Sequence, residues 1–210
     1  MRDIKTASLD YENDLYKNGY KLIAGIDEVG RGPLAGPVVA CAVIMPLGMQ
    51  ISGVYDSKSI SEKKRLALAE IIKESAIAWA IGWADEQLID EINILQATYV
   101  AMAHALDNLK IMPDALLIDG LKGTWIPKIP SQFIKSGDSA SHSIAAASIL
   151  AKVARDSYMQ KWHEKYPAYG FNANKGYGTA KHIEAIKNIG VCPLHRRSFL
   201  KKIGGSANVQ

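Results

Sequence analysis

Two adjacent carboxylates, Asp27 and Glu28, are the residues of this sequence best suited to chemistry. They follow the apolar run 21–26 and lead directly into residues 30–37, Gly-Arg-Gly-Pro-Leu-Ala-Gly-Pro. Two further aspartates, Asp119 and Asp138, each follow an apolar or small-residue segment. Four carboxylates that converge from distant segments would supply the oxygen ligands that hard cations prefer. The pattern predicts a site for metal-assisted phosphoryl transfer, facing a ligand that the backbone of the glycine loop contacts.

Each acid also has a simpler explanation. Asp119-Gly120 on its own is a common turn, and Asp138 in Gly-Asp-Ser could be a turn or helix-capping residue. The position of Asp119 immediately after Ala-Leu-Leu-Ile favours catalysis, because a sheet holds the backbone of a strand-end residue firmly. Consecutive strand residues point to opposite faces, so we expect the strand to end or bulge at Glu28 if both acids serve one centre.

The hydrophobic pattern alternates strands with helices and shows no linker, repeat or low-complexity segment. It predicts an α/β fold in which helices flank a mixed central sheet, with residues 1–178 as the catalytic domain and 179–210 as a helical C-terminal extension. The expected strands are 21–26, 38–45, 76–83 and 115–118. The expected helices are 59–75, with a Ser59–Glu62 capping box and an apolar stripe of Leu66, Ala69 and Ile72, then 143–158, and a last helix from Thr179 to Gly190. A further amphipathic helix between the first two carries Leu88, Ile92, Leu95, Tyr99, Met102 and Leu106 on one face.

Composition is ordinary for one globular domain. The 210 residues are 48% hydrophobic and 22% charged, and the longest strictly apolar run, Val38 to Met45, is too short to span a bilayer. The first residues carry mixed charges rather than a signal-peptide core, so we expect a cytoplasmic protein. Cys41 and Cys192 lack Cys-x-x-Cys spacing, which argues against a disulfide framework or a cysteine zinc site.

Charge is distributed unevenly along the chain. Residues 1–151 contain 14 Lys and Arg against 18 Asp and Glu, whereas residues 152–210 contain 11 against 3. A basic region interleaved with aromatic residues suits a nucleic-acid backbone, and a solvated helical face over core aromatics explains it equally well. In particular, Arg196 and Arg197 are candidate contacts to duplex phosphates.

Several other patterns carry less functional weight. The glycines of residues 30–36 are followed by prolines and a β-branched run rather than a helix, which disfavours a dinucleotide fingerprint. The five histidines show no compact ligand spacing. The acids at 85, 86, 90 and 91 are typical of a solvated helical face, and we leave them out of the site.

These motifs together resemble the bacterial type 2 ribonucleases H, the ribonuclease HII family. The resemblance covers most of the chain, and the only departure noted is Val29, where the family often has Ala. The related type 3 enzymes carry an additional N-terminal domain, and only about two dozen residues precede the first motif here. The matching segments are 24–39, 56–58 (Asp-Ser-Lys), 93–98 (Asn-Ile-Leu-Gln-Ala-Thr), 118–120 (Ile-Asp-Gly), 137–138 (Gly-Asp), 143–156 (Ser-Ile-Ala-Ala-Ala-Ser-Ile-Leu-Ala-Lys-Val-Ala-Arg-Asp), 176–179 (Gly-Tyr-Gly-Thr) and 195–199 (His-Arg-Arg-Ser-Phe).

The resemblance implies a ribonuclease H-like fold and an endonuclease that hydrolyses the RNA strand of RNA/DNA hybrids. It also implies cleavage at ribonucleotides embedded in duplex DNA, with two Mg²⁺ or Mn²⁺ ions, 5′-phosphate and 3′-hydroxyl products, and a role in ribonucleotide removal during replication and repair. We expect a monomer with nucleic acid as its partner and no membrane association. By this likeness the metal-binding acids are Asp27, Glu28, Asp119 and Asp138. The resemblance also implies that the 2′-hydroxyl is recognised by the backbone of Gly30, Arg31 and Gly32 and by Tyr177, which stacks on the neighbouring sugar. It implies that Ser57 and Lys58 hold phosphates.

Two alternatives remain open on sequence. One is a non-catalytic nucleic-acid-binding module on the same scaffold, although clustered carboxylates repel phosphate unless metals intervene. The other is a two-carboxylate glycoside hydrolase, which would work without a metal.

Overall fold

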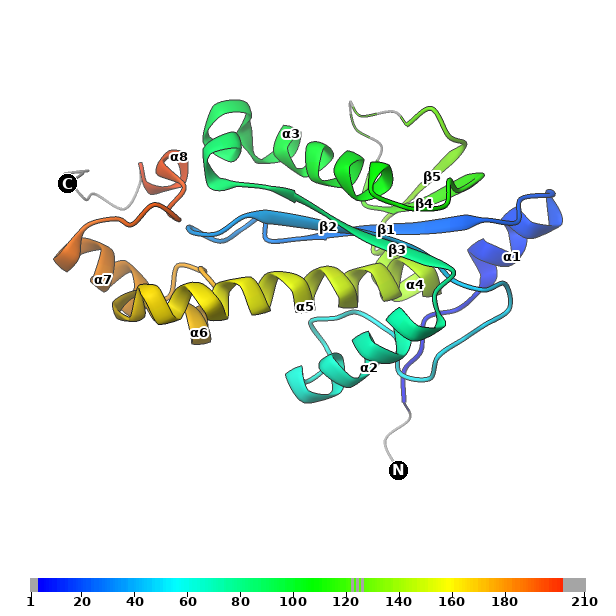
Figure 1. Cartoon of the computed structure of the whole chain (residues 1–210), viewed down its shortest axis with the longest axis horizontal. Helices are drawn as coiled ribbons and strands as arrows, with labels where there is room; N and C mark the ends of the chain where they lie inside the picture. The colour runs from blue at the N-terminus through cyan, green and yellow to red at the C-terminus, as the bar shows by residue number, and fades with distance from the viewer. Residues whose placement is uncertain (1–3, 122, 124, 126, 202–210) are drawn as a thin grey trace.

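A mixed five-stranded sheet runs through the centre of the molecule in a computed structural model that describes residues 4–201 except 122, 124 and 126 (Figure 1). The strand order is β3-β2-β1-β4-β5. Strand β1 is central, antiparallel to β2 and parallel to β4. The predicted fold class is therefore confirmed. The strands are β1 (Ile23–Val29), β2 (Val38–Ile44), β3 (Ala78–Ala84), β4 (Ala115–Asp119) and β5 (Ser131–Ile134).

Helices cover both faces of this sheet (Figure 1). Helix α3 packs on one face against the core residues of β1, β2 and β4, and α5 packs on the other together with α2. Helices α6 and α7 lie near the C-terminal end of α5, and α8 lies beside the start of α3, where the Arg197 and Ser198 amides donate to Asp90 (Figure 1). The helices are α1 (Asp10–Lys17), α2 (Glu62–Ser75), α3 (Glu86–Asp107), α4 (Gly137–Ala140), α5 (His142–Lys165), α6 (Phe171–Asn174), α7 (Ala180–Ile189) and α8 (Arg197–Leu200), with a 3₁₀ turn at Pro167–Tyr169.

The strand nearest the paired acids is regular, which corrects one expectation. Strand β1 continues through Asp27 and Glu28 to Val29, and its antiparallel register with β2 is uninterrupted, with Asp27 opposite Cys41 and Glu28 opposite Ala40. The predicted strand end or bulge at Glu28 was therefore wrong. Strand β5 was missed, because its short sequence Ser-Gln-Phe-Ile has no apolar alternation and it pairs only at the sheet edge.

Two helices differ in detail from their predicted patterns. Helix α2 is capped by Ser61, whose side chain accepts a hydrogen bond from the Lys64 amide, so the capping box at Ser59 was wrong. Leu66 is largely exposed, and the buried stripe passes through Leu68, Ala69 and Ile72 instead.

Helix α3 buries Met102 of the predicted face fully, together with small residues that include Ala97, Ala101 and Ala105. The rest of the predicted face packs partly buried against the core, apart from the exposed Leu95. Asn93 interrupts the helix with a left-handed φ of 67°, and its side-chain oxygen accepts hydrogen bonds from the amides of Leu95 and Gln96. The second half of α3 is thus capped from within.

Gly25 explains how closely α5 approaches the sheet. A Cβ atom at this position would collide with the backbone of Ser143 and Ile144 in the first turn of α5. Close contact here sets Ser148, one turn further along the helix, beside Asp27, with which its side chain is hydrogen-bonded. The small-residue face of α5 therefore positions the site as well as filling the core.

The C-terminal segments pack on the rest of the chain through their own apolar cluster. Met159 from α5, Phe171 from α6, Ile186 from α7 and Leu194 enclose Ala35 of the glycine loop. The boundary at 178/179 stays a prediction, and residues 202–210 of the expected extension lie outside the described residues. Among the helices that the structure describes, none combines the length and apolarity needed to cross a membrane.

Candidate functional site

Three acids from two strands meet at the centre of the sheet. Each of Asp27, Glu28 and Asp119 offers a carboxylate oxygen, and these oxygens all lie within 4.8 Å of one another. Asp119 is the last residue of β4, and one of its oxygens accepts a 2.6 Å hydrogen bond from the Gly137 amide at the start of α4. These are three of the four acids that the sequence expects to converge.

The neighbouring acids Asp27 and Glu28 share a centre because β4 stops before β1 does. The parallel register of the two strands ends at Ile26 opposite Ile118, so β1 has no paired neighbour on that side at Asp27 and Glu28. Asp27 lies on the α5 face, where it is 4% exposed. Glu28 has the longer side chain and can bring its carboxylate around the open edge. A regular strand therefore suffices, without a bulge.

Burial and mutual repulsion make this cluster electrostatically costly. The pKa of Asp27 is raised well above its ordinary value, first by burial and then by the charges of Glu28 and Asp119. The pKa of Glu28 is raised by burial and by Asp119, and Arg31, whose Nη1 is 3.4 Å from the Glu28 carboxylate, opposes the shift. Crowded anions of this kind require a cation to be stable as carboxylates.

The donor set fits a hard divalent cation. All three groups offer oxygen, and their spacing allows one ion to contact more than one of them. No histidine or cysteine belongs to the cluster, which disfavours zinc and other softer metals. Carboxylate ligands of this kind suit hard divalent cations such as Mg²⁺, Ca²⁺ and Mn²⁺.

Asp138 and Lys58 lie at the rim of the acid cluster. Asp138, in α4, is half-buried, and burial followed by the charge of Asp119 raises its pKa. It is not among the three acids whose oxygens converge within 4.8 Å. Lys58 is exposed; the charges of Asp27, Asp138 and Asp56 raise its pKa and outweigh partial burial. A cation thus stands at the mouth of the site, where an anionic ligand would enter.

Ser57, expected to hold a phosphate, lies beneath the surface. It is 3% exposed, and its hydroxyl is 2.9 Å from the Ser148 hydroxyl, which in turn is hydrogen-bonded to Asp27. Its side chain therefore supports the acid cluster through Ser148.

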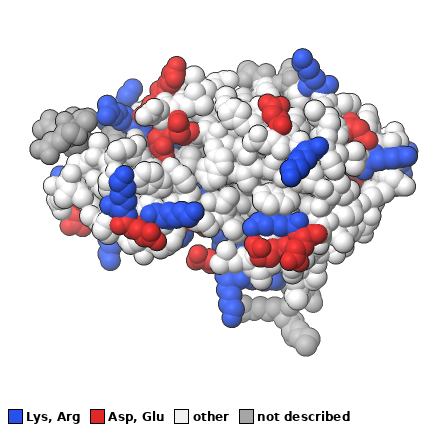
Figure 2. All heavy atoms as spheres, viewed as in Figure 1, with Lys and Arg blue, Asp and Glu red and all other residues white. Residues whose placement is uncertain are grey.

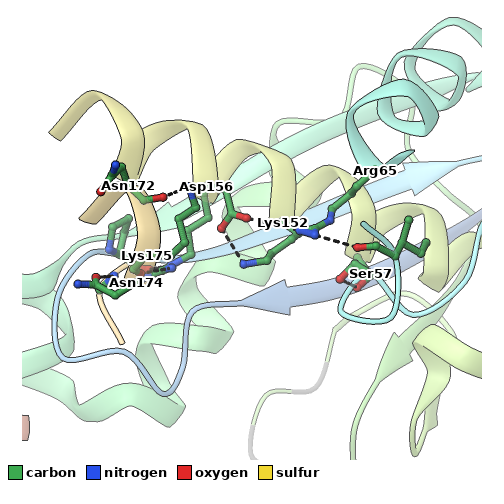
Figure 3. Close-up of polar contacts among 12 residues, drawn as sticks. Ser57, Arg65, Lys152, Asp156, Asn172, Asn174 and Lys175 are labelled. Atoms are coloured by element: carbon green, nitrogen blue, oxygen red, sulfur yellow. Dashed lines mark hydrogen bonds and ion pairs between the residues drawn. The ribbon is translucent and has the colours of Figure 1, made fainter. Parts of the chain in front are cut away.

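A neighbouring polar network ties α2 to α5 (Figure 3). The Lys152 and Arg65 side chains both point at Asp156, with N–O distances of 2.7 Å and 3.5 Å. Because these cations are paired inside the protein, they are not free to hold phosphate.

Two buried arginines hold the glycine loop, residues 30–37, from the protein interior. The Arg155 guanidinium donates to the carbonyls of Ala35 and Pro37 and, beyond the loop, to that of Lys175. The Arg196 guanidinium donates to the carbonyls of Gly30, Arg31 and Gly36, at 2.5 to 3.1 Å. Both side chains are fully buried. We refer to Arg155 and Arg196 as the arginine clamp.

The arginine clamp places Arg196 differently from the sequence prediction. A fully buried guanidinium whose donors are used by loop carbonyls cannot reach a duplex phosphate. Its neighbour Arg197 is exposed, as expected for a backbone contact. The excess positive charge after residue 152 thus belongs partly to the interior. On the face shown in Figure 2, basic side chains are interspersed with acidic ones instead of forming a continuous patch.

Glu86 is a buried acid that the sequence analysis left out of the site. It is 7% exposed, and one carboxylate oxygen has no hydrogen-bond partner among the described residues. Burial raises its pKa to about 7, and the charges of Arg196 and Arg155 oppose the shift. Glu86 thus supplies negative charge near the arginine clamp. Its position in the first turn of a helix gives no signal of this, because acids there are usually solvated.

Tyr177 stands beside the glycine loop. Its ring lies 3.6 Å from where a Cβ of Gly32 would be, and the residue is 41% exposed. The carbonyl of Gly176 accepts hydrogen bonds from the amides of Leu34 and Ala35, so the tyrosine turn and the loop are joined through their backbones. The exposed ring, the loop backbone and the acid cluster are thus connected parts of one surface.

Comparison with known proteins places this geometry among nucleases. The family model described as Ribonuclease HII matches residues 24–202. A ribonuclease HII from Acetivibrio thermocellus is 56% identical over 191 residues, covering 91% of this chain and 74% of that protein. One from Syntrophus aciditrophicus is 52% identical over 192 residues, covering 91% of this chain and 90% of that protein.

Solved structures agree with the sequence matches. The ribonuclease H2 of Pyrococcus horikoshii superposes with a TM-score of 0.68 at 26% identity, covering 86% of this chain and 96% of that one. The ribonuclease HII of Archaeoglobus fulgidus, solved in complex with PCNA, gives a TM-score of 0.69 at 25% identity, covering 84% and 94%.

Proposed function

Because the chain belongs to the ribonuclease HII family, we propose that it hydrolyses RNA/DNA hybrids and cuts beside single ribonucleotides in duplex DNA. Membership of this family makes it a ribonuclease H, an endonuclease of the hydrolase class that acts on nucleic acid. The proposal adds the embedded-ribonucleotide substrate, dependence on Mg²⁺ or Mn²⁺ and the identity of the site residues.

The observation that carries the proposal is the convergence of Asp27, Glu28 and Asp119 within 4.8 Å. A set of buried anions repels a phosphodiester unless cations intervene, so this arrangement supports a metal-dependent nuclease over a simple binding module. Asp138 would complete the set of four acids from the rim.

Each group of site residues has a proposed role that follows from its position. The acid cluster would hold the divalent ions, and Lys58 and Arg197 would contact backbone phosphates from the surface. When bound, Mg²⁺ or Mn²⁺ would activate the attacking water and stabilise the leaving oxygen. Cleavage of the bond between phosphorus and the 3′ oxygen leaves a 3′-hydroxyl on one product and a 5′-phosphate on the other. The loop 30–32 and Tyr177 would select the 2′-hydroxyl.

A labelled DNA duplex containing one ribonucleotide tests the proposal directly. We expect cleavage at that nucleotide with Mg²⁺ or Mn²⁺ and none after EDTA is added. An all-DNA duplex of the same sequence is the control. Cleavage that persists in EDTA, or equal cleavage of both duplexes, would refute the proposed activity.

Gly32 offers a test of backbone recognition. A Cβ there would meet only the Tyr177 ring at an ordinary contact distance of 3.6 Å, and its φ lies outside the left-handed region. We therefore expect Gly32→Ala to fold normally but to lose about tenfold or more in kcat/KM, because the added methyl occupies space that a ribose would need. A melting curve and kcat/KM measure the two effects. Gly48→Ala lies in an open surface turn and controls for activity: its φ of 74° should make the added methyl lower the melting temperature, while kcat/KM stays unchanged. Full activity in Gly32→Ala would remove this glycine from the recognition surface.

Tyr177→Ala is expected to impair cleavage at a single embedded ribonucleotide more than cleavage of a continuous hybrid. One 2′-hydroxyl marks the first substrate, whereas a hybrid offers many and has an altered helix shape. Stacking is worth roughly 1–3 kcal/mol per contact, so the single-ribonucleotide rate should fall by about tenfold or more. Tyr177→Phe keeps the ring and separates stacking from the hydroxyl contact. Equal losses of kcat/KM on both substrates, with a lower melting temperature, would make Tyr177 a packing residue.

A further inference from the structure

A buried chain of hydrogen bonds joins the Tyr177 turn to the C-terminal segment. His182 Nδ1 lies 2.9 Å from the Tyr177 carbonyl oxygen, and His182 Nε2 lies 3.1 Å from His195 Nε2. At the other end, His195 Nδ1 accepts a 2.9 Å hydrogen bond from the Cys192 amide. His182 is fully buried and His195 is 4% exposed. We refer to His182 and His195 as the histidine pair.

The endpoints of this chain determine both tautomers. A carbonyl oxygen can only accept, so His182 must carry its proton on Nδ1, which leaves its Nε2 as an acceptor. His195 must then donate from Nε2, which leaves its Nδ1 free to accept from the Cys192 amide. The opposite pair of tautomers would set a lone pair of His182 against the Tyr177 carbonyl. One arrangement of neutral rings therefore satisfies the three hydrogen bonds of the chain; the Cys192 carbonyl and Sγ, each 3.2 Å from His195 Nδ1, are more distant from it than the Cys192 amide.

The surroundings of the histidine pair favour neutral rings. Aromatic edges of Tyr169 and Phe171 pack against both imidazoles. Burial lowers the pKa of His182, and burial together with His182 lowers the pKa of His195 to about 4. A proton added to His182 Nε2 would set two N–H groups against each other. One added to His195 Nδ1 would oppose the Cys192 amide at 2.9 Å, with the Cys192 carbonyl further away at 3.2 Å.

A metal bound between the two rings does not explain this arrangement. An ion bridging two imidazole nitrogens needs about 2.0–2.1 Å to each, or roughly 3.3 Å between nitrogens even at a tetrahedral angle, with further ligands around it. The observed 3.1 Å is a hydrogen-bond distance. The third polar side chain present, Cys192, has its sulfur 3.2 Å from His195 Nδ1, on the opposite side of that ring from His182.

The chain connects the two parts of the proposed recognition surface. His195 forms a β-bridge with Ala35 of the glycine loop, and the next residue donates its amide to the Leu34 carbonyl. Tyr177, between two glycines, has its carbonyl held locally by the Thr179 amide and over a longer range by His182. The histidine pair thus spans from a residue that is fixed to the loop to the turn that carries the tyrosine.

We propose that the histidine pair is a positioning device that fixes the Tyr177 turn relative to the glycine loop, so that ring and loop backbone meet a 2′-hydroxyl together. Neither histidine belongs to the acid cluster, and in this proposal neither touches the substrate. The inference rests on the proposed function of Tyr177, and it adds residues that act through that tyrosine. It predicts a specific tautomeric state and a specific loss of substrate discrimination.

Nitrogen-15 NMR of imidazole-labelled protein tests the tautomers without any activity assay. We expect His182 as the Nδ1-protonated form and His195 as the Nε2-protonated form at neutral pH, with a scalar coupling or cross-peak between their Nε2 atoms. Assignments come from the loss of one signal set in His182→Asn and the other in His195→Asn. Observation of His182 in the Nε2-protonated form, or of a charged imidazole, would overturn the proposal.

Two variants of His182 test the effect on discrimination. His182→Phe keeps an aromatic ring against Phe171 but removes both polar contacts, and we expect kcat/KM on a single embedded ribonucleotide to fall by about tenfold, the loss typical of one buried hydrogen bond. The hybrid should lose much less. His182→Asn keeps an amide donor near the position of Nδ1, so it should recover most of the discrimination.

These outcomes separate this inference from the proposed function. If Tyr177→Ala loses discrimination but His182→Phe keeps it in a folded protein, the histidine pair does not position the tyrosine. If Tyr177→Ala keeps discrimination, the role of Tyr177 itself fails, and the NMR result still decides whether the tautomeric chain exists. Equal losses on both substrates in His182→Phe, without recovery in His182→Asn, would show a general packing role and overturn the proposal.

Discussion

Asp27→Asn is expected to reduce cleavage by about a thousandfold or more while preserving the fold, because two-metal chemistry depends on anionic ligands held in place. The amide keeps the size of the carboxylate, and its oxygen can still accept the 2.7 Å hydrogen bond from the Glu28 amide. Its charge, which would help to hold the proposed cation between Glu28 and Asp119, is lost. Single-turnover rates on the one-ribonucleotide duplex, with Mg²⁺ and with Mn²⁺, measure the effect.

The same substitution should stabilise the metal-free protein at neutral pH. Burial, Glu28 and Asp119 raise the pKa of Asp27 in the folded state, so the unfolded chain ionises this group more readily. The carboxylate therefore destabilises the fold above its ordinary pKa of about 3.9, and the penalty disappears below it. Urea unfolding in EDTA should show the variant more stable than wild type at pH 7, with the difference vanishing as the pH falls toward 4.

Asp14→Asn is the matched control, because its carboxylate is on the outer helix α1 and is 76% exposed. It should change neither the cleavage rate nor the stability measurably. Substantial metal-dependent cleavage by Asp27→Asn would contradict the assignment of the acid cluster. A variant that is inactive but also strongly destabilised in EDTA would instead make Asp27 a structural residue.

The sequence predicts the acids well because their signals are local. Asp27 and Asp119 each end an apolar segment, and parallel or neighbouring strands bring such positions together at one edge. The predicted bulge at Glu28 was wrong. Alternating side chains are kept on opposite faces only where a strand has neighbours on both sides. Here β4 stops beside Asp27, and a longer side chain can pass around the open edge.

The residues that the sequence misplaced are those whose roles depend on distant partners. Glu86 and Arg196 lie 110 positions apart, and the charge of each shifts the pKa of the other in the interior. Nothing in their local sequence distinguishes them from solvated charges. The same holds for Asn93, whose left-handed conformation interrupts α3 within a stretch whose hydrophobic period predicts an uninterrupted helix. A short stretch of sequence shows the hydrophobic period of a helix or strand, but it does not show which charged residues distant segments will bury.

Arg196→Met is expected to destabilise the protein by at least about 3 kcal/mol, because three carbonyls of the glycine loop, two of them in buried hydrogen bonds, would lose their charged donor. For a domain of this size, that corresponds to a fall in melting temperature of roughly 6–12 °C. Burial and the nearby Arg155 lower the pKa of Arg196 to about 9, so the side chain is a cation at neutral pH and its removal also leaves Glu86 without that charge. We expect Arg196→Lys to recover little, because an ammonium cannot reproduce the planar fork that serves Gly30, Arg31 and Gly36.

The neighbouring Arg197→Met supplies a control of identical chemistry. Arg197 is exposed, and its hydrogen bond to Asp90 uses the backbone amide, so the substitution should leave the melting temperature nearly unchanged. If its side chain contacts a phosphate, the slope of binding affinity against salt concentration should shrink by about one unit. In Arg196→Met that slope should stay the same among folded molecules, since a buried guanidinium releases no counterion on binding. A reduced slope with an unchanged melting temperature in Arg196→Met would place this side chain on the duplex and would contradict the arginine clamp.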